Sequence, residues 1–442
     1  MEIYKQLPKK NCGECGPPTC LAFAMQLASG KATLDACPYI SQEAREALQS
    51  AAAPPIRLVT LGAGDHVLEI GDETVLFRHD KTFYHPAGIF IEVGDDLDEA
   101  AMDERLRAIG ELEFERVGQQ YRVDGVALRA VSGEADRFLR LAQKAAAAVP
   151  WNFVIVCQDP ALAEPVVRLL ASRRPLLYAA TDDNWEKMVQ LAEEHQIPLG
   201  VCGRDLDHLA ELVTKITQRG YRELVIDPGS RETSQVLADL TQIRRLAIKK
   251  KFRPFGYPTI AFTSEPDATT EIIQAQVYVG KYASLVVLRQ AWRRSEILPL
   301  LTWRTNVFTD PQKPIQVEPR VYEVGDVRDD SPVYVTTNFS LTYFSVEAEV
   351  EASKIPGYIV VVNTEGTSVL TAYAAGKFTP EAVAEALQRS GIADRVKHRE
   401  VIIPGHVAVM SGKLQELSGW KVIVGPREAA GIPAFVRSRY AA

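Results

Sequence analysis

The sequence predicts an α/β protein in three parts, and three observations lead to that class. Its 442 residues are about three times the ~150 residues of a typical domain. Short apolar runs of strand type alternate with helical patterns along most of the chain. Two proline-containing joints interrupt this alternation, AAAPP at 51–55 and TDPQKPIQVEPR at 309–320. We therefore expect domains over residues 1–55, 56–318 and 319–442.

The middle part predicts a TIM-like (β/α)8 barrel. Nine candidate strands lie between residues 56 and 290, close to the eight that such a barrel needs. They are IRLVTLG, AGIFIEVGD, GVALRAV, NFVIVCQD, PLLYAAT, PLGVCG, ELVIDPG, PTIAF and YASLVVLR. Strands that are apolar on both faces are typical of parallel sheets covered by helices. An open parallel sheet is the competing architecture.

The last part predicts a small doubly wound sheet. Four strand patterns, PVYVTTNF, GYIVVVNT, REVIIPG and KVIVGP, alternate with helices that begin near residues 340, 367, 380 and 406. In open parallel sheets, ligands bind beyond the carboxyl ends of the strands, where the strand order reverses. A ligand of this domain is therefore expected at the loops after Tyr334, Val362, Ile403 and Val424.

Composition excludes several classes of function. A formal charge of −7 provides no basic field for a polyanion, so nucleic acid is not expected as a partner. No apolar run approaches the ~20 residues that cross a bilayer, and the amino terminus has no signal-type apolar segment, so we expect no membrane association and a cytoplasmic location. Neither GxGxxG after a strand nor GxxxxGK[ST] occurs, so nicotinamide and nucleotide cofactors lack their usual motifs.

Four cysteines near the amino terminus carry the strongest chemical signal. Their spacing is Cys12-x2-Cys15-x4-Cys20-x16-Cys37, and cytoplasmic thiols of this kind are more often metal ligands than disulfides. Four thiolates can hold either one [4Fe-4S] cluster or one Zn²⁺. Structural zinc usually takes two short CxxC knuckles, whereas here there is one, and Pro38 follows the last cysteine as in ferredoxin-like runs. The pattern favours a cluster used in electron transfer, with zinc as the alternative.

Three other residues have simpler interpretations. Cys157 and Cys202 lie inside apolar strand patterns and are expected to be small buried hydrophobic residues. Asp227 ends a predicted barrel strand, where barrel active sites form, and could contact a pterin. The commoner role of such a carboxylate is to cap the next helix.

Several segments resemble one known family. They are EIYKQLPKKNCGECGPPTCLAFAMQLASGKA, GSRETSQVLADLTQIRRLAIKKKFRPFGYP, SPVYVTTNFSLTYFSVEAEVE and GWKVIVGPREAAGIPAF. Together they look like the large (gamma) subunit of the corrinoid iron-sulfur protein of the acetyl-CoA synthase/CO dehydrogenase system. The resemblance spans essentially the whole chain. It implies an amino-terminal cluster domain, a central barrel and a carboxy-terminal domain that holds a cobamide.

The resemblance implies a methyl carrier of the reductive acetyl-CoA pathway, used in carbon dioxide fixation. Cob(I)amide would accept a methyl group from methyltetrahydrofolate through a separate methyltransferase and pass it to acetyl-CoA synthase/CO dehydrogenase. The cluster would return Co(II) to Co(I), and a smaller (delta) subunit would complete a heterodimer. Because cobalt is then the nucleophile, no catalytic side chain is expected, and the chain is a carrier subunit rather than a stand-alone enzyme. The alternative is an iron-sulfur reductive activator that binds no corrinoid of its own.

The resemblance and the sheet topology together place the cobamide in the four carboxyl-end loops. The expected cofactor-binding residues are Thr336, Thr337, Asn338, Thr342, Gly366, Thr367, Ser368, Val369, Thr371, Gly405, Gly425, Ala429, Ala430 and Gly431. The same loops also contain His406 and Arg427. The cobamide is expected base-off, because the DxHxxG motif of His-ligated cobalamin domains is absent, with the loop from Gly366 to Thr371 beneath its lower face. His398 and His406 are not expected to ligate cobalt.

Overall fold

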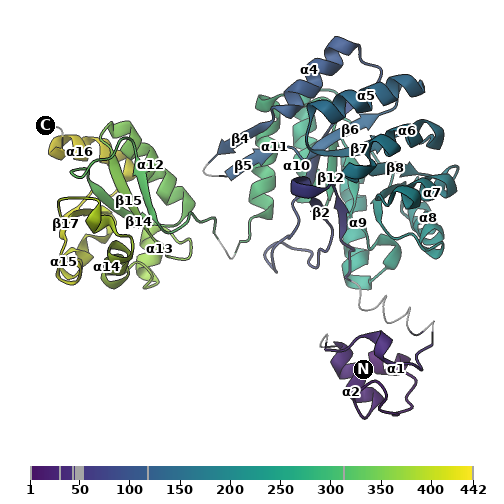
Figure 1. Ribbon diagram of the computed structural model, residues 1–442, viewed down its shortest axis with the longest axis horizontal. Coiled ribbons are helices and arrows are strands. Elements are labelled where there is room, and N and C mark those ends of the chain that lie inside the picture. Colours follow the sequence, from purple (N-terminus) through teal and green to yellow (C-terminus); the bar gives the residue numbers. More distant parts are fainter. Residues whose placement is uncertain are drawn as a thin grey trace.

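The computed structural model describes residues 2–28, 31–41, 44, 54–116, 119–311 and 314–440, which form three bodies (Figure 1). Ala51, Ala52 and Ala53 of the first predicted joint lie outside the described residues. Among the described helices, none is long and apolar enough to cross a membrane.

The amino-terminal body is small and has its own core. Helices α1 (Glu2–Gln6) and α2 (Cys20–Ala28) pack together, and a single 3₁₀ turn follows at Leu34–Ala36. Leu7, Phe23, Cys20 and Cys37 are buried together in this core. The first turn of α2 is capped by Thr19, whose Oγ1 accepts a hydrogen bond from the Ala22 amide at 3.1 Å. Two of the four cysteines are therefore fixed by the core of this body.

The central body is a nearly closed parallel barrel, as predicted. Its strands run in the order β10-β9-β8-β7-β6-β3-β12-β11, and every neighbouring pair is parallel. A parallel bridge between Ile226 and Thr259 joins the two ends of this order. The strands are β3 (Gly88–Gly94), β6 (Gly125–Arg129), β7 (Asn152–Val156), β8 (Leu176–Ala180), β9 (Leu199–Cys202), β10 (Leu224–Asp227), β11 (Ile260–Phe262) and β12 (Leu285–Leu288).

Helices cover the outside of the barrel (Figure 1). They are α4 (Glu99–Gly110), α5 (Ala135–Ala148), α6 (Pro160–Leu170), α7 (Trp185–His195), α8 (Leu206–Gln218), α9 (Thr233–Lys250), α10 (Ala268–Gly280) and α11 (Arg294–Phe308). Asp98, Asp159, Asp205 and Asp267 cap α4, α6, α8 and α10 by accepting amide hydrogen bonds of the first turn. A short hairpin, β4 (Glu113–Arg116) and β5 (Gln119–Arg122), extends from this shell.

The first of the nine predicted strands does not belong to the barrel wall. Its residues form β1 (Val59–Leu61), which pairs antiparallel with β2 (Leu68–Ile70). Val59, Leu61 and Ile70 pack into the barrel interior, and the Gly62 amide donates to the Arg174 carbonyl just before β8. The hairpin thus closes the amino end of the barrel. An apolar run that plugs a barrel has the same pattern as one that lines it, so the sequence did not separate the two.

The carboxy-terminal body is a five-stranded sheet with helices on both faces. Strand order is β13-β15-β14-β16-β17, with β13 antiparallel at one edge and the other four parallel. The strands are β13 (Val321–Val324), β14 (Val333–Thr337), β15 (Gly357–Val362), β16 (Glu400–Ile403) and β17 (Lys421–Val424). The strand β13 was not predicted, because its four residues adjoin the proline-rich joint.

Two helices pack on one face of this sheet and three on the other. The first pair is α12 (Ser340–Ser353) and α16 (Ile432–Tyr440), and the second group is α13 (Val369–Ala374), α14 (Pro380–Arg389) and α15 (Ser411–Ser418). The connection out of β14 leads to β15 on one side, and the chain then crosses to β16 on the other side. The strand order therefore reverses between β14 and β16, where open sheets bind ligands.

Candidate cofactor sites

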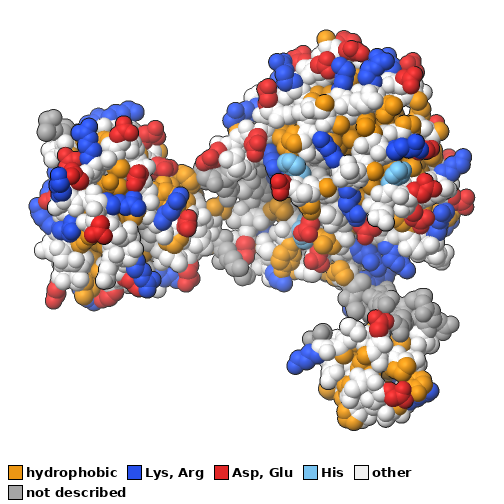
Figure 2. All heavy atoms as spheres, in the orientation of Figure 1, with side chains coloured by type: hydrophobic (Ala, Val, Ile, Leu, Met, Phe, Trp, Pro, Cys, Tyr) orange, Lys and Arg blue, Asp and Glu red, His pale blue; other side chains and the backbone are white. Residues whose placement is uncertain are grey.

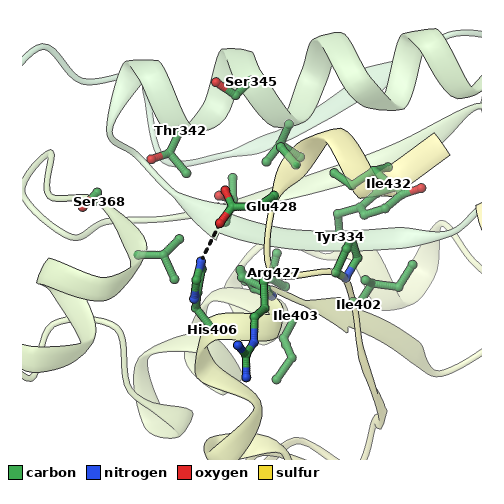
Figure 3. Close-up of a pocket in the computed structure, with 18 of the residues that line it drawn as sticks. Tyr334, Thr342, Ser345, Ser368, Ile402, Ile403, His406, Arg427, Glu428 and Ile432 are labelled. Atoms are coloured by element: carbon green, nitrogen blue, oxygen red, sulfur yellow. Dashed lines mark ion pairs between the residues drawn. The ribbon is translucent and has the colours of Figure 1, made fainter. Parts of the chain in front are cut away.

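A pocket of about 360 Å³ lies at the carboxyl ends of β14 and β16 (Figure 3). It is lined by the ends of these strands, the first turns of α12 and α13, the loops after β16 and β17, and the start of α16. The predicted residues that line it are Thr336, Thr342, Ser368, Val369, Gly425 and Ala429. His406 and Arg427 also line it. The lining therefore comes from β14 and β16, from the first turns of α12 and α13, and from the loops after β16 and β17.

The apolar part of this lining was not predicted from the sequence. Tyr334, Ile402 and Ile432 lie together at one side of the pocket (Figure 3). The first two are strand residues that look like ordinary core. Ser345, on α12, could have been found, because it follows the predicted Thr342 by three residues and so shares its helical face.

One buried hydroxyl group of the pocket, Thr336 Oγ1, has no hydrogen-bond partner among the described residues, and Thr336 is fully buried. The Tyr334 phenol is also unpartnered, but its ring lies against Gly357 at the amino end of β15, so the phenol points away from the pocket. Buried polar groups are normally hydrogen-bonded. Thr336 therefore fits a ligand that carries amide groups, such as the rim of a corrinoid.

Asn338 lies outside the pocket and has an internal role. Its Oδ1 accepts hydrogen bonds from the Thr364 amide at 2.9 Å and the Gly366 amide at 3.0 Å, and its Nδ2 donates to Gln316 at 2.8 Å. The side chain thereby fixes the loop after β15. The other predicted residues outside the lining are Thr337, Gly366, Thr367, Thr371, Gly405, Ala430 and Gly431.

Gly405 allows the loops after β16 and β17 to touch. A Cβ atom there would lie 2.6 Å from the Gly425 carbonyl oxygen and 2.8 Å from the Arg427 amide nitrogen. The Gly405 amide donates to the Pro426 carbonyl at 2.9 Å, and the Gly425 amide donates to the Ile403 carbonyl at 2.9 Å. The side of the pocket formed by these two loops therefore depends on a residue without a side chain.

Substitution of Gly405 by alanine is expected to separate these loops. Overpacking against backbone should reduce the free energy of unfolding by about 1–3 kcal/mol. Gly412→Ala is the matched control, because Gly412 lies within α15 and a Cβ there meets no heavy atom within 4 Å. Urea unfolding of both variants checks the expectation, and equal stability of the two would contradict it.

The four cysteines differ in burial. Cys20 and Cys37 are buried, Cys15 is half-buried and Cys12 is exposed. Burial raises the pKa of the Cys15 thiol, and the charges of Cys37, Cys12 and Cys20 raise it further. In the described part of the chain, no three His, Cys, Asp or Glu side chains already meet closely enough to hold a metal ion.

The backbone around these cysteines is shaped by glycine. Gly13 and Gly16 have positive φ angles of 75° and 103°, and the Gly16 amide donates to the Gly13 carbonyl at 3.0 Å. The Asn11 side chain accepts from the Cys20 amide at 2.8 Å and holds the loop to the start of α2. A tight loop that presents four thiols, two of them buried, is a donor set that fits an iron-sulfur cluster.

The barrel residues singled out in the sequence have structural roles. Burial raises the pKa of Cys157 and of Cys202 to about 11, so both remain neutral thiols. The Asp227 carboxylate is buried and accepts hydrogen bonds from the Tyr178 hydroxyl at 2.6 Å, the Gly229 amide at 2.7 Å and Arg231 Nη2 at 2.9 Å. These donors occupy the carboxylate, so the structure gives no support to a pterin contact.

Replacement of Asp227 by alanine is expected to destabilise the barrel. It removes a buried carboxylate that accepts hydrogen bonds from Tyr178 and Gly229, and leaving such donors without an acceptor costs about 1–3 kcal/mol. Its ion-pair partner Arg231 is 39% exposed, so water can solvate that charge instead. Asp103→Ala is the control, because Asp103 is exposed and pairs with Lys144 at 2.7 Å, a contact worth about 0–1 kcal/mol. Chemical denaturation compares the two variants, and a small effect at Asp227 would contradict the structural role.

A four-cysteine domain, a parallel barrel and a parallel sheet with a pocket where its strand order reverses define a multidomain α/β protein with two candidate cofactor sites. The family described as CO dehydrogenase/acetyl-CoA synthase delta subunit matches residues 58–436, and the family described as "Putative Fe-S cluster" matches residues 7–39.

Full-length relatives identify the family. The chain is 56% identical over 441 residues to the corrinoid/iron-sulfur protein large subunit of Moorella thermoacetica, covering 100% of this chain and 99% of that one. It is 36% identical to the acetyl-CoA decarbonylase/synthase complex subunit gamma of Methanothermobacter thermautotrophicus, covering 99% and 98%. The chain therefore belongs to the family of corrinoid/iron-sulfur protein large subunits, and the predicted resemblance is confirmed.

Among solved structures, dihydropteroate synthase of Yersinia pestis is similar to part of this chain. The TM-score is 0.34 and the sequence identity is 12%, with coverage of 52% of this chain and 98% of that one.

Proposed function

We propose that this chain is the methyl-carrying subunit of an acetyl-CoA synthase system and holds both a cobamide and a [4Fe-4S] cluster. The observation that carries the proposal is the pocket between β14 and β16, in a chain related over its full length to a corrinoid/iron-sulfur protein. When bound, the cobamide supplies a nucleophilic cobalt that takes up and releases a methyl group. The chain itself binds and orients that cofactor.

Different pocket residues would contact different parts of the cofactor. The buried hydroxyl of Thr336 would donate to an amide of the cofactor, while Ile402 and Ile432 would contact its apolar parts. Ser368 and Val369 open α13 next to the pocket and would lie beneath the macrocycle. No side chain is proposed to ligate cobalt. A lower position left to water or empty favours Co(I) over the higher oxidation states.

Cys12, Cys15, Cys20 and Cys37 are proposed as the ligands of the cluster. When bound, the cluster supplies one-electron transfer at low potential. The core that includes Leu7 and Phe23 keeps solvent from the buried cysteines, and the positive φ angles of Gly13 and Gly16 would let backbone amides approach the cluster. This site would return adventitious Co(II) to Co(I).

A second protein is needed to enclose the cofactor. A pocket of about 360 Å³ is smaller than a cobamide, so part of the macrocycle would remain outside it. Leu341, Leu370 and Val424 border the pocket region with exposed fractions of 60%, 52% and 41%. An apolar rim of this kind fits a protein interface. We propose the small (delta) subunit here, with methyltetrahydrofolate methyltransferase and acetyl-CoA synthase/CO dehydrogenase as exchange partners.

Methyl transfer tests the proposal directly. The chain, coproduced with its small subunit and reduced, should accept label from isotopically labelled methyltetrahydrofolate when a methyltransferase is added. It should then pass the label to acetyl-CoA synthase. Label that never reaches a corrinoid on this chain would contradict the proposal.

A further inference from the structure

Arg427 is an unpaired cation at the pocket. Three ionisable side chains, His406, Arg427 and Glu428, lie together in its lining (Figure 3). His406 Nε2 lies 3.4 Å from Glu428 Oε1, so these two residues face each other. Within the described part of the chain, the Arg427 side chain makes no ion pair with a carboxylate. The pocket therefore presents one uncompensated guanidinium group.

The position of Arg427 is fixed by its backbone. Its amide nitrogen lies against Gly405, where the loops after β16 and β17 touch. Arg427 is exposed, and in Figure 3 its guanidinium group extends away from Glu428 at the edge of the pocket. A guanidinium offers several N–H donors in a planar fork that matches a phosphate group, and such charge-assisted pairs are stronger than neutral hydrogen bonds.

The chemistry of the proposed cofactor contains one matching group. The peripheral amides of a complete cobamide are neutral, whereas the phosphodiester of its nucleotide loop carries a fixed negative charge. We propose that Arg427 binds this phosphodiester and so selects complete cobamides over corrinoids that lack the nucleotide loop. The inference rests on the proposed function and adds a specificity-determining residue to its pocket.

Binding of two corrinoids tests this role. Cyanocobalamin contains the phosphodiester, whereas dicyanocobinamide lacks the whole nucleotide loop. The chain is prepared without corrinoid in complex with its small subunit, and affinity is measured by equilibrium titration followed by absorbance. Arg427→Met should weaken cyanocobalamin binding about ten- to a hundred-fold, because one charge-assisted hydrogen-bonding group is lost. Its affinity for dicyanocobinamide should stay at the wild-type value.

Two further variants complete the experiment. Arg427→Lys keeps the positive charge but loses the planar set of guanidinium N–H donors, and it should give an intermediate affinity for cyanocobalamin. Arg389→Met is the matched control, because Arg389 pairs with Glu385 on the exposed side of α14 and is absent from the pocket lining. It should bind both corrinoids as the wild type does. Thermal unfolding of each variant verifies that the domain is intact.

The outcomes separate the two proposals. Equal effects of Arg427→Met on both corrinoids, or no effect on either, would overturn the phosphodiester assignment and leave cobamide binding in place. A wild-type complex that binds neither corrinoid would overturn the proposed function together with this inference.

Discussion

Serine at position 20 or 37 is expected to abolish the iron-sulfur cluster. Both cysteines are buried in the small core of the amino-terminal body, so no outside ligand can readily replace a lost thiolate. A serine hydroxyl is a much weaker ligand for iron than a thiolate. Iron and acid-labile sulfide should fall from about four of each per chain to near zero, as the ligand count of a cubane requires.

The same substitution in the barrel provides the control. Cys157→Ser and Cys202→Ser change thiols that lie at strand ends of the barrel, and both variants should retain the full iron content. Loss of the cluster should leave a bound corrinoid that low-potential protein donors no longer reduce. Zinc without labile sulfide in the wild-type protein would contradict the cluster assignment.

Histidine at position 371 is expected to create a cobalt ligand. Thr371 lies in α13, where its Oγ1 accepts a hydrogen bond from Ser368 at 3.1 Å, and Ser368, Val369 and Leu370 line the pocket. An imidazole introduced here would reach the proposed lower face of the macrocycle. Nitrogen splitting should then appear in the Co(II) electron paramagnetic resonance spectrum. Reduction to Co(I) should become harder, with methyl acceptance slowed about tenfold or more, which is 1.4 kcal/mol or more in barrier.

His406→Ala is the companion variant. The ring of His406 faces Glu428. We expect no axial nitrogen splitting in the wild-type spectrum, so the spectrum of His406→Ala should be unchanged. Nitrogen splitting in the wild type that disappears in His406→Ala would show that this histidine ligates cobalt. An unchanged spectrum in Thr371→His would place the cobamide away from α13.

Much of the fold follows from local pattern. The eight barrel strands were visible because each is apolar on both faces and is followed by a helix. The strand β1 was wrongly assigned to the barrel wall, because residues that plug a barrel have the same apolar pattern as residues that line it. The edge strand β13 was not predicted, because its apolar pattern is short, only partly buried and next to prolines.

The candidate pocket lies in the region that the sequence predicted, but only some of its lining residues were predicted. Topology identified the loops, since parallel strands bring their carboxyl ends to one edge of the sheet. Topology could not show that the Asn338 side chain hydrogen-bonds to the loop after β15, because these contacts join residues far apart in sequence. Nor could it show that Tyr334 and Ile402 border the pocket, because both have the pattern of core residues.

The most direct test of the account is the absorption spectrum of the anaerobically purified chain, coproduced with its small subunit, before and after reduction by titanium(III). We predict corrinoid bands that change to those of Co(I), above broad cluster absorption that fades on reduction, with about one cobalt and about four irons per chain. Cluster absorption without corrinoid bands would contradict the account and would instead indicate a reductive activator that serves another corrinoid protein.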